Sequence, residues 1–460
     1  MTLTKIHTTK RSSRNIEPLS RTTDRPIGLV LDAETIVGEW DGIRWRDVPR
    51  KAALYVNAVR DIWPKIETGE LTSRYWISDV KQHWNPSGWD WESPQGNRHR
   101  LYFLKHALDD FSLWDRWEGL LALVECVRAA GANVGSIGGM MGSLERATIP
   151  TMMRIPKDVG APADELWRGS RVEPRRGIRA DFKNAVLWDM PNAYPTRLAA
   201  TLLPRRWVYW EAKPHESIPD EPGFAKALVI VPRMLLGPLP KMIRGFRARF
   251  PTHDEFKGTW TLDELRAARD SGATVILYEF WTGSAYSQPW RAWGETVLGM
   301  RDSFDGAALR LVKMGANAYV GSLAASGEIG YGRFVNGVEE RWLLGQHARP
   351  TSVTAHALVT GRTRADLFSS ALHPFAYAFI TCHTDGAIFM DEPEIDIPGF
   401  RIKRRMAECF IINAQTYAWR NPDSDWGYVH AGIPDPAAGR SFWRRWERLK
   451  SGVADADKRE

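Results

Sequence analysis

The sequence predicts a soluble α+β protein with more than one domain. Short apolar runs, such as IGLVL (27–31) and TVILYEF (274–280), are bounded by turn residues and predict buried strands. Helical spacing recurs between such runs; in TLDELRAARDSGA, Thr261 is placed to cap a helix and Gly272 to end it. The 460 residues are 43% hydrophobic and 25% charged, so we expect two to four domains of roughly 100–200 residues each.

Charge and composition narrow the choice of partners. A net charge of +7 and 22 tryptophans are compatible with binding to a nucleic acid. No apolar run reaches the roughly 18 residues that span a bilayer, so no membrane is expected. The basic N-terminus lacks the apolar stretch of a secretory signal and predicts a flexible tail on a cytoplasmic protein, in a bacterium or a phage-infected host. Cys126, Cys382 and Cys409 are too few and too scattered for a disulfide framework or a zinc site.

Further patterns predict both helices and strands. The apolar residues over 101–124 recur at helical spacing, with Gly131 as a stop. Turn-forming residues predict a loop over 80–98 and a polar linker over 161–178. We also expect a strand at 227–232, helices over 299–324 and a strand–turn–strand unit at 374–390, with Gly386 at the turn.

Two aspartates at strand ends are the candidates for catalysis. Asp189 ends an apolar strand in LWDMPNAYP, and Asp385 lies in the predicted turn CHTDG. If their strands are neighbours in one antiparallel sheet, the two carboxylates can hold divalent ions that activate a hydroxyl and neutralise a triphosphate. The alternative for each residue is an ordinary turn aspartate.

A helix is predicted between these aspartates, over LRLVKMGANAYVGSL (309–323). Lys313, Asn317 and Gly321 share one face of it. The lysine could meet a triphosphate, and Tyr319 and Gly321 could let a base pair approach closely. The alternative is an exposed lysine on an ordinary helix.

In this order, the three segments resemble the polymerase motifs of B-family DNA polymerases, most closely the small phage-type and plasmid-type members. Motif A of that family is roughly D-x2-SLYPS, motif B is K-x3-NS-x-YG and motif C is Y-x-DTDS; the counterparts here are DMPNAYPT (189–196), KMGANAYVG (313–321) and TCHTDG (381–386). Flanking segments extend the resemblance to about residues 160–440. WRGSRVE (167–173) resembles the loop between the exonuclease and polymerase domains, and GTWTLDELRAARDSGATV (258–275) resembles a segment that precedes motif B. QTY (415–417) falls where the family has a clamp on the primer terminus, and AGIP (431–434) resembles the start of a thumb.

The resemblance implies an α+β right-hand polymerase fold, with palm, fingers and a small thumb, after an N-terminal reduced exonuclease-like (RNase H-like) α/β domain. The expected parts are a flexible basic tail (1–25), the exonuclease-like domain (26–160), a first palm part with motif A (161–235), an insertion (236–298), fingers with motif B (299–340), a second palm part with motif C and QTY (341–420) and a thumb (421–460).

The resemblance also implies a role for each matching residue. Asp189 and Asp385 are the catalytic pair, and with the backbone carbonyl of Met190 they are expected to hold two Mg²⁺ ions, for which Mn²⁺ is a substitute. The incoming dNTP is expected to contact Tyr194, which packs under the sugar, and Arg301, Lys313, Asn317 and Tyr319. Primer–template DNA is expected to contact Arg168, Gly169, Gly321, Thr384, Gln415 and Tyr417.

The chain departs from the family pattern at several of its positions. His383 stands where motif C commonly has its first Asp, Gln415 where the primer clamp has Lys, and Gly386 where motif C has Ser. Ser170 and Ala318 replace a Gly of the interdomain loop and the Ser of motif B. We interpret His383 as a tuning change, and we expect Gln415 to weaken the hold on the primer because it carries no charge.

The N-terminal third is a weaker match to the proofreading exonucleases of the family. Asp32 and Glu34 form the D-x-E pattern after an apolar strand, and Asp109 or Asp110 could supply a later carboxylate. The middle exonuclease motif is missing in good form, since NAVRD (57–61) lacks its aromatic residue. We therefore favour a reduced domain and leave 3′–5′ exonuclease activity open.

The resemblance thus implies a DNA-directed DNA polymerase of phage or mobile-element replication, which extends a 3′ hydroxyl with dNTPs. One alternative is a polymerase-like protein that holds primer–template DNA without chemistry, and another is a nuclease that uses Asp32, Glu34 and Asp109. The primer is also open. Segments 200–257 and 332–352 fall where protein-primed members carry insertions, so a terminal (priming) protein and a nucleic-acid primer are competing partners.

Overall fold

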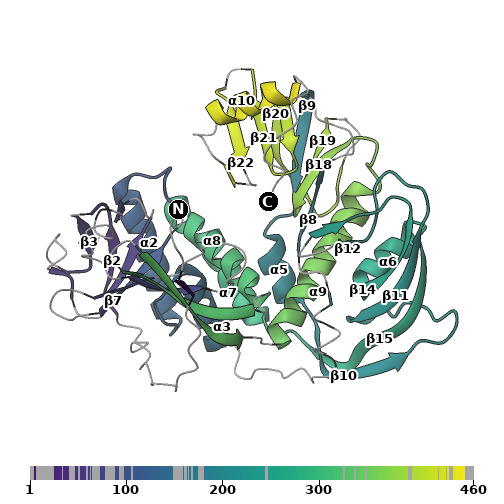
Figure 1. Cartoon of the computed structure of the whole chain (residues 1–460), viewed down its shortest axis with the longest axis horizontal. Coiled ribbons are helices and arrows are strands. Elements are labelled where there is room, and N and C mark those ends of the chain that lie inside the picture. Colours follow the sequence, from purple (N-terminus) through teal and green to yellow (C-terminus); the bar gives the residue numbers. More distant parts are fainter. Residues whose placement is uncertain are drawn as a thin grey trace. The chain divides into compact units, whose positions relative to one another are not determined.

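In the computed structural model the described residues form both helices and strands, which confirms the predicted mixture (Figure 1). The chain divides into two compact units, each built from separate segments: unit 1 comprises residues 1–155, 198–203 and 287–356, and unit 2 comprises 156–197, 204–286 and 357–460. The seven-part division stays a prediction. The structure describes residues 5–6, 25–33, 35–40, 47–49, 52–57, 61–62, 64, 73–77, 89–92, 98–104, 107–148, 159, 163, 165–166, 169–174, 181–243, 247–324, 327–335, 338–347, 350–391, 396–422, 424–430, 433–434 and 439–450.

Unit 1 contains one large mixed sheet. Four strands at one end carry its buried core: β2 pairs antiparallel with β3 and parallel with β4, and β4 pairs parallel with β7. The hairpin β16–β17, from the second predicted insertion, extends the other end of this sheet through β5. The described strands run in the order β1 (Lys5–Ile6), β17 (Val338–His347), β16 (Gly327–Val335), β5 (Ser73–Ile77), β6 (Trp89–Glu92), β7 (Arg98–Phe103), β4 (Ala53–Val56), β2 (Ile27–Val30) and β3 (Ile36–Gly38).

The helices of unit 1 pack around the segment that contains motif B. That segment forms α8 (Gly306–Leu323), which contacts α2 (Leu113–Ala129), α3 (Ile137–Thr148) and α7 (Arg291–Ser303). Gly315 permits the close approach of α3, because a Cβ there would lie 2.8 Å from Cγ2 of Ile137. A larger residue at Gly315 would therefore push α3 and α8 apart.

Two expectations for unit 1 are wrong. The helix predicted from residue 101 begins at Leu113, where Ser112 caps it, and residues 98–103 form β7 instead. Leu101 and Phe103 belong to the sheet's core, so burial on a strand determines this short segment in spite of its helical spacing. The predicted stop is confirmed, since Gly131 has φ +69°. The predicted loop over 80–98 contains β6, which pairs with β7; its residues 80–88 and 93–97 lie outside the described residues.

Unit 2 is organised around an antiparallel sheet whose central strand is β9 (Asp181–Asp189). β19 pairs with one edge of β9 and β20 with the other. The predicted hairpin is confirmed as β18 and β19, and the predicted linker contains β8. The described strands follow the order β23 (Ile433–Pro434), β22 (Gly427–His430), β21 (Thr416–Arg420), β20 (Arg401–Asn413), β9, β19 (Gly386–Met390), β18 (Phe379–Thr384) and β8 (Arg171–Pro174).

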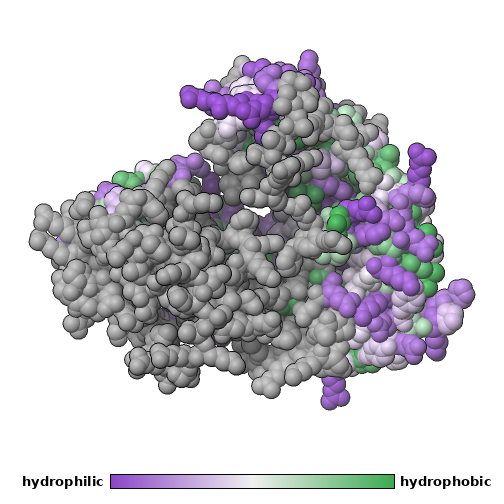
Figure 2. Space-filling view, viewed as in Figure 1, coloured by the Kyte–Doolittle hydropathy of each residue, from purple (hydrophilic) through white to green (hydrophobic). Residues whose placement is uncertain are grey.

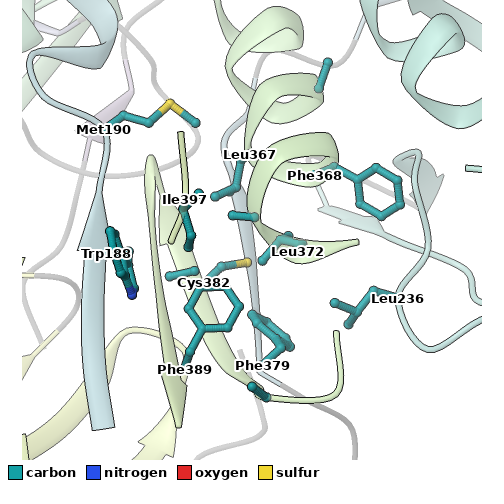
Figure 3. Close-up of a cluster of buried hydrophobic side chains, with 14 of the residues drawn as sticks. Trp188, Met190, Leu236, Leu367, Phe368, Leu372, Phe379, Cys382, Phe389 and Ile397 are labelled. Carbon is teal, nitrogen blue, oxygen red and sulfur yellow. The ribbon is translucent and has the colours of Figure 1, made fainter. Parts of the chain in front are cut away.

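Apolar side chains cover both faces of this sheet near β9. Val186 and Trp188 point to one face, where they pack with α9 (Pro350–Leu367) and with the π-helix that follows it (Phe368–Leu372) (Figure 3). Ala185 and Leu187 point to the other face, with Met406 of β20. Side chains alternate along a strand, so burial on both faces fixes the register of β9 against its neighbours.

The first predicted insertion (200–257) contributes strands to a second antiparallel sheet in unit 2, which also contains strand residues from 258–287. Its strands run in the order β10 (Leu203–Glu211), β15 (Thr274–Ser287), β11 (Phe224–Val231) and β14 (Asp254–Thr261), and α6 (Leu262–Asp270) packs beside them (Figure 1). A two-stranded sheet of β12 (Lys241–Ile243) and β13 (Arg247–Arg249) accompanies it. The surface of this region mixes apolar and polar residues (Figure 2). The expected helix limits are confirmed, because Thr261 and Glu264 form a reciprocal capping box and Gly272 has φ +99°.

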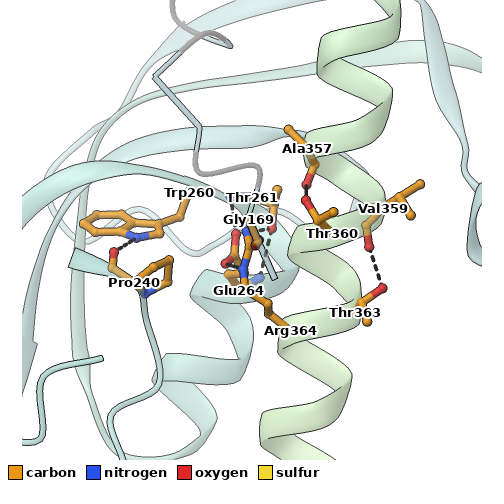
Figure 4. Close-up of polar contacts among 10 residues, drawn as sticks. All are labelled: Gly169, Pro240, Trp260, Thr261, Glu264, Ala357, Val359, Thr360, Thr363 and Arg364. Atoms are coloured by element: carbon orange, nitrogen blue, oxygen red, sulfur yellow. Dashed lines mark hydrogen bonds and ion pairs between the residues drawn. The ribbon is translucent and has the colours of Figure 1, made fainter. Parts of the chain in front are cut away.

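A buried ion pair joins α9 to this capping box. Arg364 of α9 places Nε 2.8 Å from Oε1 of Glu264, and both side chains are almost fully buried (Figure 4). The other oxygen, Oε2, accepts hydrogen bonds from the backbone N–H and hydroxyl of Thr261. Arg364 also donates to the carbonyl of Gly169. One side chain therefore ties together α6, α9 and the segment that leads into β8.

None of the helices in the described part of the chain is long and apolar enough to cross a bilayer.

Replacing Arg364 by methionine should destabilise unit 2 by about 3–5 kcal/mol, because the substitution leaves a buried carboxylate without its cation. Urea unfolding followed by circular dichroism measures this loss. The control is Arg291→Met, which breaks the exposed Arg291–Glu295 pair on α7 and should cost far less. Equal losses in the free energy of unfolding of the two variants would contradict a stabilising role for the buried Arg364–Glu264 pair.

Candidate active site

The sheet of unit 2 brings Asp189 and Asp385 together. Asp189 is the last residue of β9, and its register partner on β19 is Gly386, the residue after Asp385. The N–H of Met190 donates to the carbonyl of Asp385 at 3.0 Å, so the strand end and the hairpin turn are bonded directly. The cation site predicted from the sequence requires the strand of Asp189 and the hairpin of Asp385 to be neighbours in one antiparallel sheet. The structure shows that they are.

The carboxylate of Asp189 carries an unfavourable charge that nearby cations offset. Burial, and then the charge of Asp385, raise the pKa of Asp189 above its ordinary value. Lys403 of β20 opposes this rise, with Nζ 3.2 Å from Oδ1 of Asp189, and Arg401 contributes at longer range. Two carboxylates held close together, one already compensated by an ammonium, form a site that favours cations.

The turn of the hairpin places Asp385 by strain and close packing. Thr384 has φ +60°, a left-handed conformation unusual for a β-branched residue, and its hydroxyl donates to Oδ1 of Asp385 at 2.6 Å. Gly386 does not supply the positive φ that a turn glycine usually provides. Its role is space: a Cβ there would lie 2.9 Å from the carbonyl oxygen of Trp188 and 3.1 Å from Oδ1 of Asp189. The Ser that motif C commonly has would crowd the carboxylate.

Tyr194, the predicted sugar contact, lies on α5 (Ala193–Ala200), one turn after Asp189. Its hydroxyl and that of Ser170 are 2.8 Å apart. Burial raises the pKa of Tyr194 to about 12, and the charge of Asp385 contributes to the rise. Tyr194 is therefore close enough to Asp385 for that charge to raise its pKa, and the hydroxyl stays protonated. Gly169, a predicted DNA contact beside Ser170, is held by Arg364, and Arg168 lies outside the described residues.

The predicted primer-clamp segment lies at the turn between β20 and β21. Gln415 places Nε2 2.9 Å from Nε2 of His383, the residue that stands for the first aspartate of motif C. Burial, and then the charge of Lys403, lower the pKa of His383. Tyr417 is buried in the core of the sheet, and burial raises its pKa to about 12. The contact between His383 and Gln415 was not predicted from the sequence.

The residues of motif B lie on α8 and α7 of unit 1. Lys313 and Arg301 are half-buried, and Asn317 and Gly321 are exposed. Tyr319 is buried: its hydroxyl accepts a hydrogen bond from Nε1 of Trp290 at 2.8 Å, and burial raises its pKa. Packing within unit 1 thus explains why Tyr319 is buried, and its predicted contact with a nucleotide stays a prediction.

The exonuclease candidates gather at one edge of the unit 1 sheet. Asp32 follows β2, Asn57 follows β4 and Asp109 follows β7, and the carboxyl ends of these three parallel strands lie at the same edge. Nδ2 of Asn57 donates to Oδ1 of Asp109 at 2.6 Å, while Oδ1 of Asp32 accepts from the N–H of Thr35. Glu34 lies outside the described residues. Asn57 is the first residue of the imperfect middle motif, and its contact with Asp109 explains the residue without nuclease chemistry.

The aspartate pair suits a hard divalent cation better than any other group in the described ranges. Within those ranges, no three His, Cys, Asp or Glu side chains gather in a metal-binding arrangement. Carboxylate oxygens are the ligands that Mg²⁺ prefers, and it usually needs only one or two of them beside substrate and water oxygens. Asp189 and Asp385 fit that requirement, and Lys403 shows that a positive charge is stabilised at Asp189.

Comparison with known proteins bears on the fold. No family model and no curated protein matches the sequence. Solved structures of phi29 DNA polymerase do match. Its ternary complex with primer-template DNA and incoming nucleotide substrates has a TM-score of 0.64 at 11% identity, covering 90% of this chain and 93% of that chain.

Two further structures of the same polymerase agree. The complex with single-stranded DNA has a TM-score of 0.61 at 11% identity, covering 91% of this chain and 93% of that one. The post-translocation binary complex has a TM-score of 0.59 at 12% identity, covering 89% and 91%. The resemblance to phage-type B-family DNA polymerases is therefore confirmed at the level of the fold: over nine-tenths of its length, this chain is folded like phi29 DNA polymerase.

Proposed function

We propose that this protein is a template-directed DNA polymerase that extends a 3′ hydroxyl with dNTPs by two-metal nucleotidyl transfer. The observation that carries the proposal is the paired Asp189 and Asp385, fixed by adjacent strands in a fold similar to that of a DNA polymerase. In this proposal unit 2 holds the palm, α7 and α8 belong to the fingers, and the segment from 421 onward, which contains α10 (Gly439–Lys450), is the thumb.

Different side chains of unit 2 have different roles in this proposal. Asp189, Asp385 and the carbonyl of Met190 would hold two Mg²⁺ ions, which when bound lower the pKa of the attacking hydroxyl and neutralise the triphosphate. Asp385 is oriented by Thr384, and Tyr194 by Ser170, so neither has to reorganise when substrate arrives. Lys403 adds a positive charge beside the reacting groups, and Lys313, Asn317 and Arg301 on the fingers would meet the nucleotide.

The two alternatives predict different fates for a primer. A polymerase lengthens a labelled primer with Mg²⁺ and dNTPs, an exonuclease shortens it, and a binding protein without chemistry leaves its length unchanged. The altered residues His383 and Gln415 favour the binding protein when they are considered separately. In the structure, however, these two residues contact each other.

Asp189→Ala and Asp385→Ala should each lower primer extension by about a thousandfold or more, because the site then loses one of its two fixed anionic ligands. The fold and the affinity for primer–template DNA should stay close to those of the parent. Single-nucleotide extension in Mg²⁺ measures the rate. The matched control is Asp391→Ala, which removes an exposed carboxylate from the end of β19. Near-parental extension by either active-site variant would refute the two-metal assignment.

Tyr194→Val should admit ribonucleotides far more readily, since the ring is expected to exclude a 2′-hydroxyl from the sugar site. The measurement is the ratio of dNTP to rNTP incorporation by the same variant. If Tyr194 is only a core residue, both rates fall together and the ratio is unchanged. Tyr377→Val, at an exposed tyrosine, serves as the control.

A terminal protein is the proposed partner for initiation. The two segments that fall at the insertions of protein-primed members contain ordered strands: residues 200–257 include β10, β11 and the start of β14, and residues 332–352 include the end of β16 and β17. A nucleic-acid primer remains the competing possibility.

Incubation of the enzyme with template, labelled dNTP and a candidate priming protein from a neighbouring gene tests this proposal. We expect the nucleotide to become covalently attached to a Ser, Thr or Tyr hydroxyl of that protein. Asp385→Ala should abolish the labelling. Efficient extension of an oligonucleotide, with no labelled protein from any neighbouring gene, would count against protein priming.

A further inference from the structure

The two departures from the family pattern that argue most strongly against activity contact each other. His383 is the next-to-last residue of β18, and Gln415 lies in the turn between β20 and β21. Their Nε2 atoms are 2.9 Å apart. The backbone N–H of Gln415 donates to Oδ1 of Asn413 at 2.9 Å, which holds the turn that directs the amide toward the imidazole.

The two departures change the charge of this contact in opposite directions. An aspartate at position 383 would bring a negative charge and a lysine at position 415 a positive one, and groups at these positions face each other at hydrogen-bond distance. Replacing both members leaves the total charge at the contact near zero. Replacing one alone would leave a half-buried charge without its counterpart, which is the costly case.

The surroundings make a lone charge at this contact more costly. A third carboxylate at position 383 would join Asp189 and Asp385, and the neighbouring cation, Lys403, is already paired with Asp189. A lone ammonium at position 415 would face an imidazole that has no negative charge to offer. Each single change therefore disturbs the aspartate pair or the primer side of the site, and the double change does not.

We propose that His383 and Gln415 act as one positioning unit, in which the amide fixes the imidazole beside the aspartate pair, and that the two replacements are a single compensated exchange. The inference rests on the proposed polymerase function. It assigns to Gln415 a role through His383 and not through a charge on the primer. It also removes the main reason to regard the site as inactive.

A double-mutant cycle tests the proposal on the full chain. The parent, His383→Asp, Gln415→Lys and the double variant are compared by affinity for a dideoxy-terminated primer–template and by kcat and KM for one nucleotide. We expect each single variant to lose about tenfold or more in affinity or in kcat/KM, as for a half-buried charge without its counterpart. The double variant should recover to within about threefold of the parent.

Matched controls add the same charges away from this contact. His215→Asp, at an exposed histidine, and Gln288→Lys, on the segment before α7, should behave like the parent, and their effects should add when combined. Additive losses in the cycle, or single variants that match the parent, overturn the proposal.

A variant without added charge isolates the positioning role. Gln415→Met removes the hydrogen bond to His383, and we expect it to shift the imidazole nitrogen resonances of His383 in NMR spectra; unchanged resonances would overturn the proposal. The thermal unfolding midpoints of the four proteins in the double-mutant cycle provide a readout that needs no catalysis. If the parent incorporates no nucleotide, the proposed function fails, while recovery of the midpoint and of DNA affinity in the double variant still decides the inference.

Discussion

The pairing of β9 with a neighbour on each edge is the constraint on which the rest of unit 2 depends. It sets Asp189 opposite Gly386, and the bond between Met190 and the carbonyl of Asp385 closes the strand end onto the hairpin. A slip of one residue would turn Trp188 out of the core and reverse the direction of the Asp189 side chain. Burial on both faces excludes that slip. The same hydrophobic packing therefore fixes the strand register and places the two like charges of Asp189 and Asp385 near each other.

The sequence was most informative where a feature depends on neighbours in the chain. The helix α6 could be predicted at both ends because Thr261 and Gly272 are local signals. The apolar run before Asp189 and the hairpin around Asp385 were likewise visible from composition. Residues 98–103 were not, since six residues with apolar spacing can form a helix or a strand, and only the neighbouring strand β4 decides between them.

The contacts that shape the candidate site were beyond sequence reasoning because they join distant segments. Lys403 of β20 contacts Asp189 at the end of β9, and Arg364 of α9 contacts Gly169 in the segment before β8. A lysine on a strand or an arginine in a helix carries no mark of such a role. His383 and Gln415 were noticed as departures, but only the structure shows that they are bonded to each other. Local patterns thus indicated the candidate residues, and the tertiary structure shows the side chains that hold them.

The discontinuity of unit 2 has a consequence for how the protein reaches its native state. β9 ends at residue 189, whereas both of its partners, β19 and β20, lie beyond residue 385. While the ribosome makes the intervening segments, β9 has two unpaired backbone edges and an apolar pattern suited to strand addition by another chain. Contacts of such large sequence separation form slowly, because the chain between them must first be ordered. A nascent chain of this protein is therefore expected to depend on chaperones until its last strands emerge.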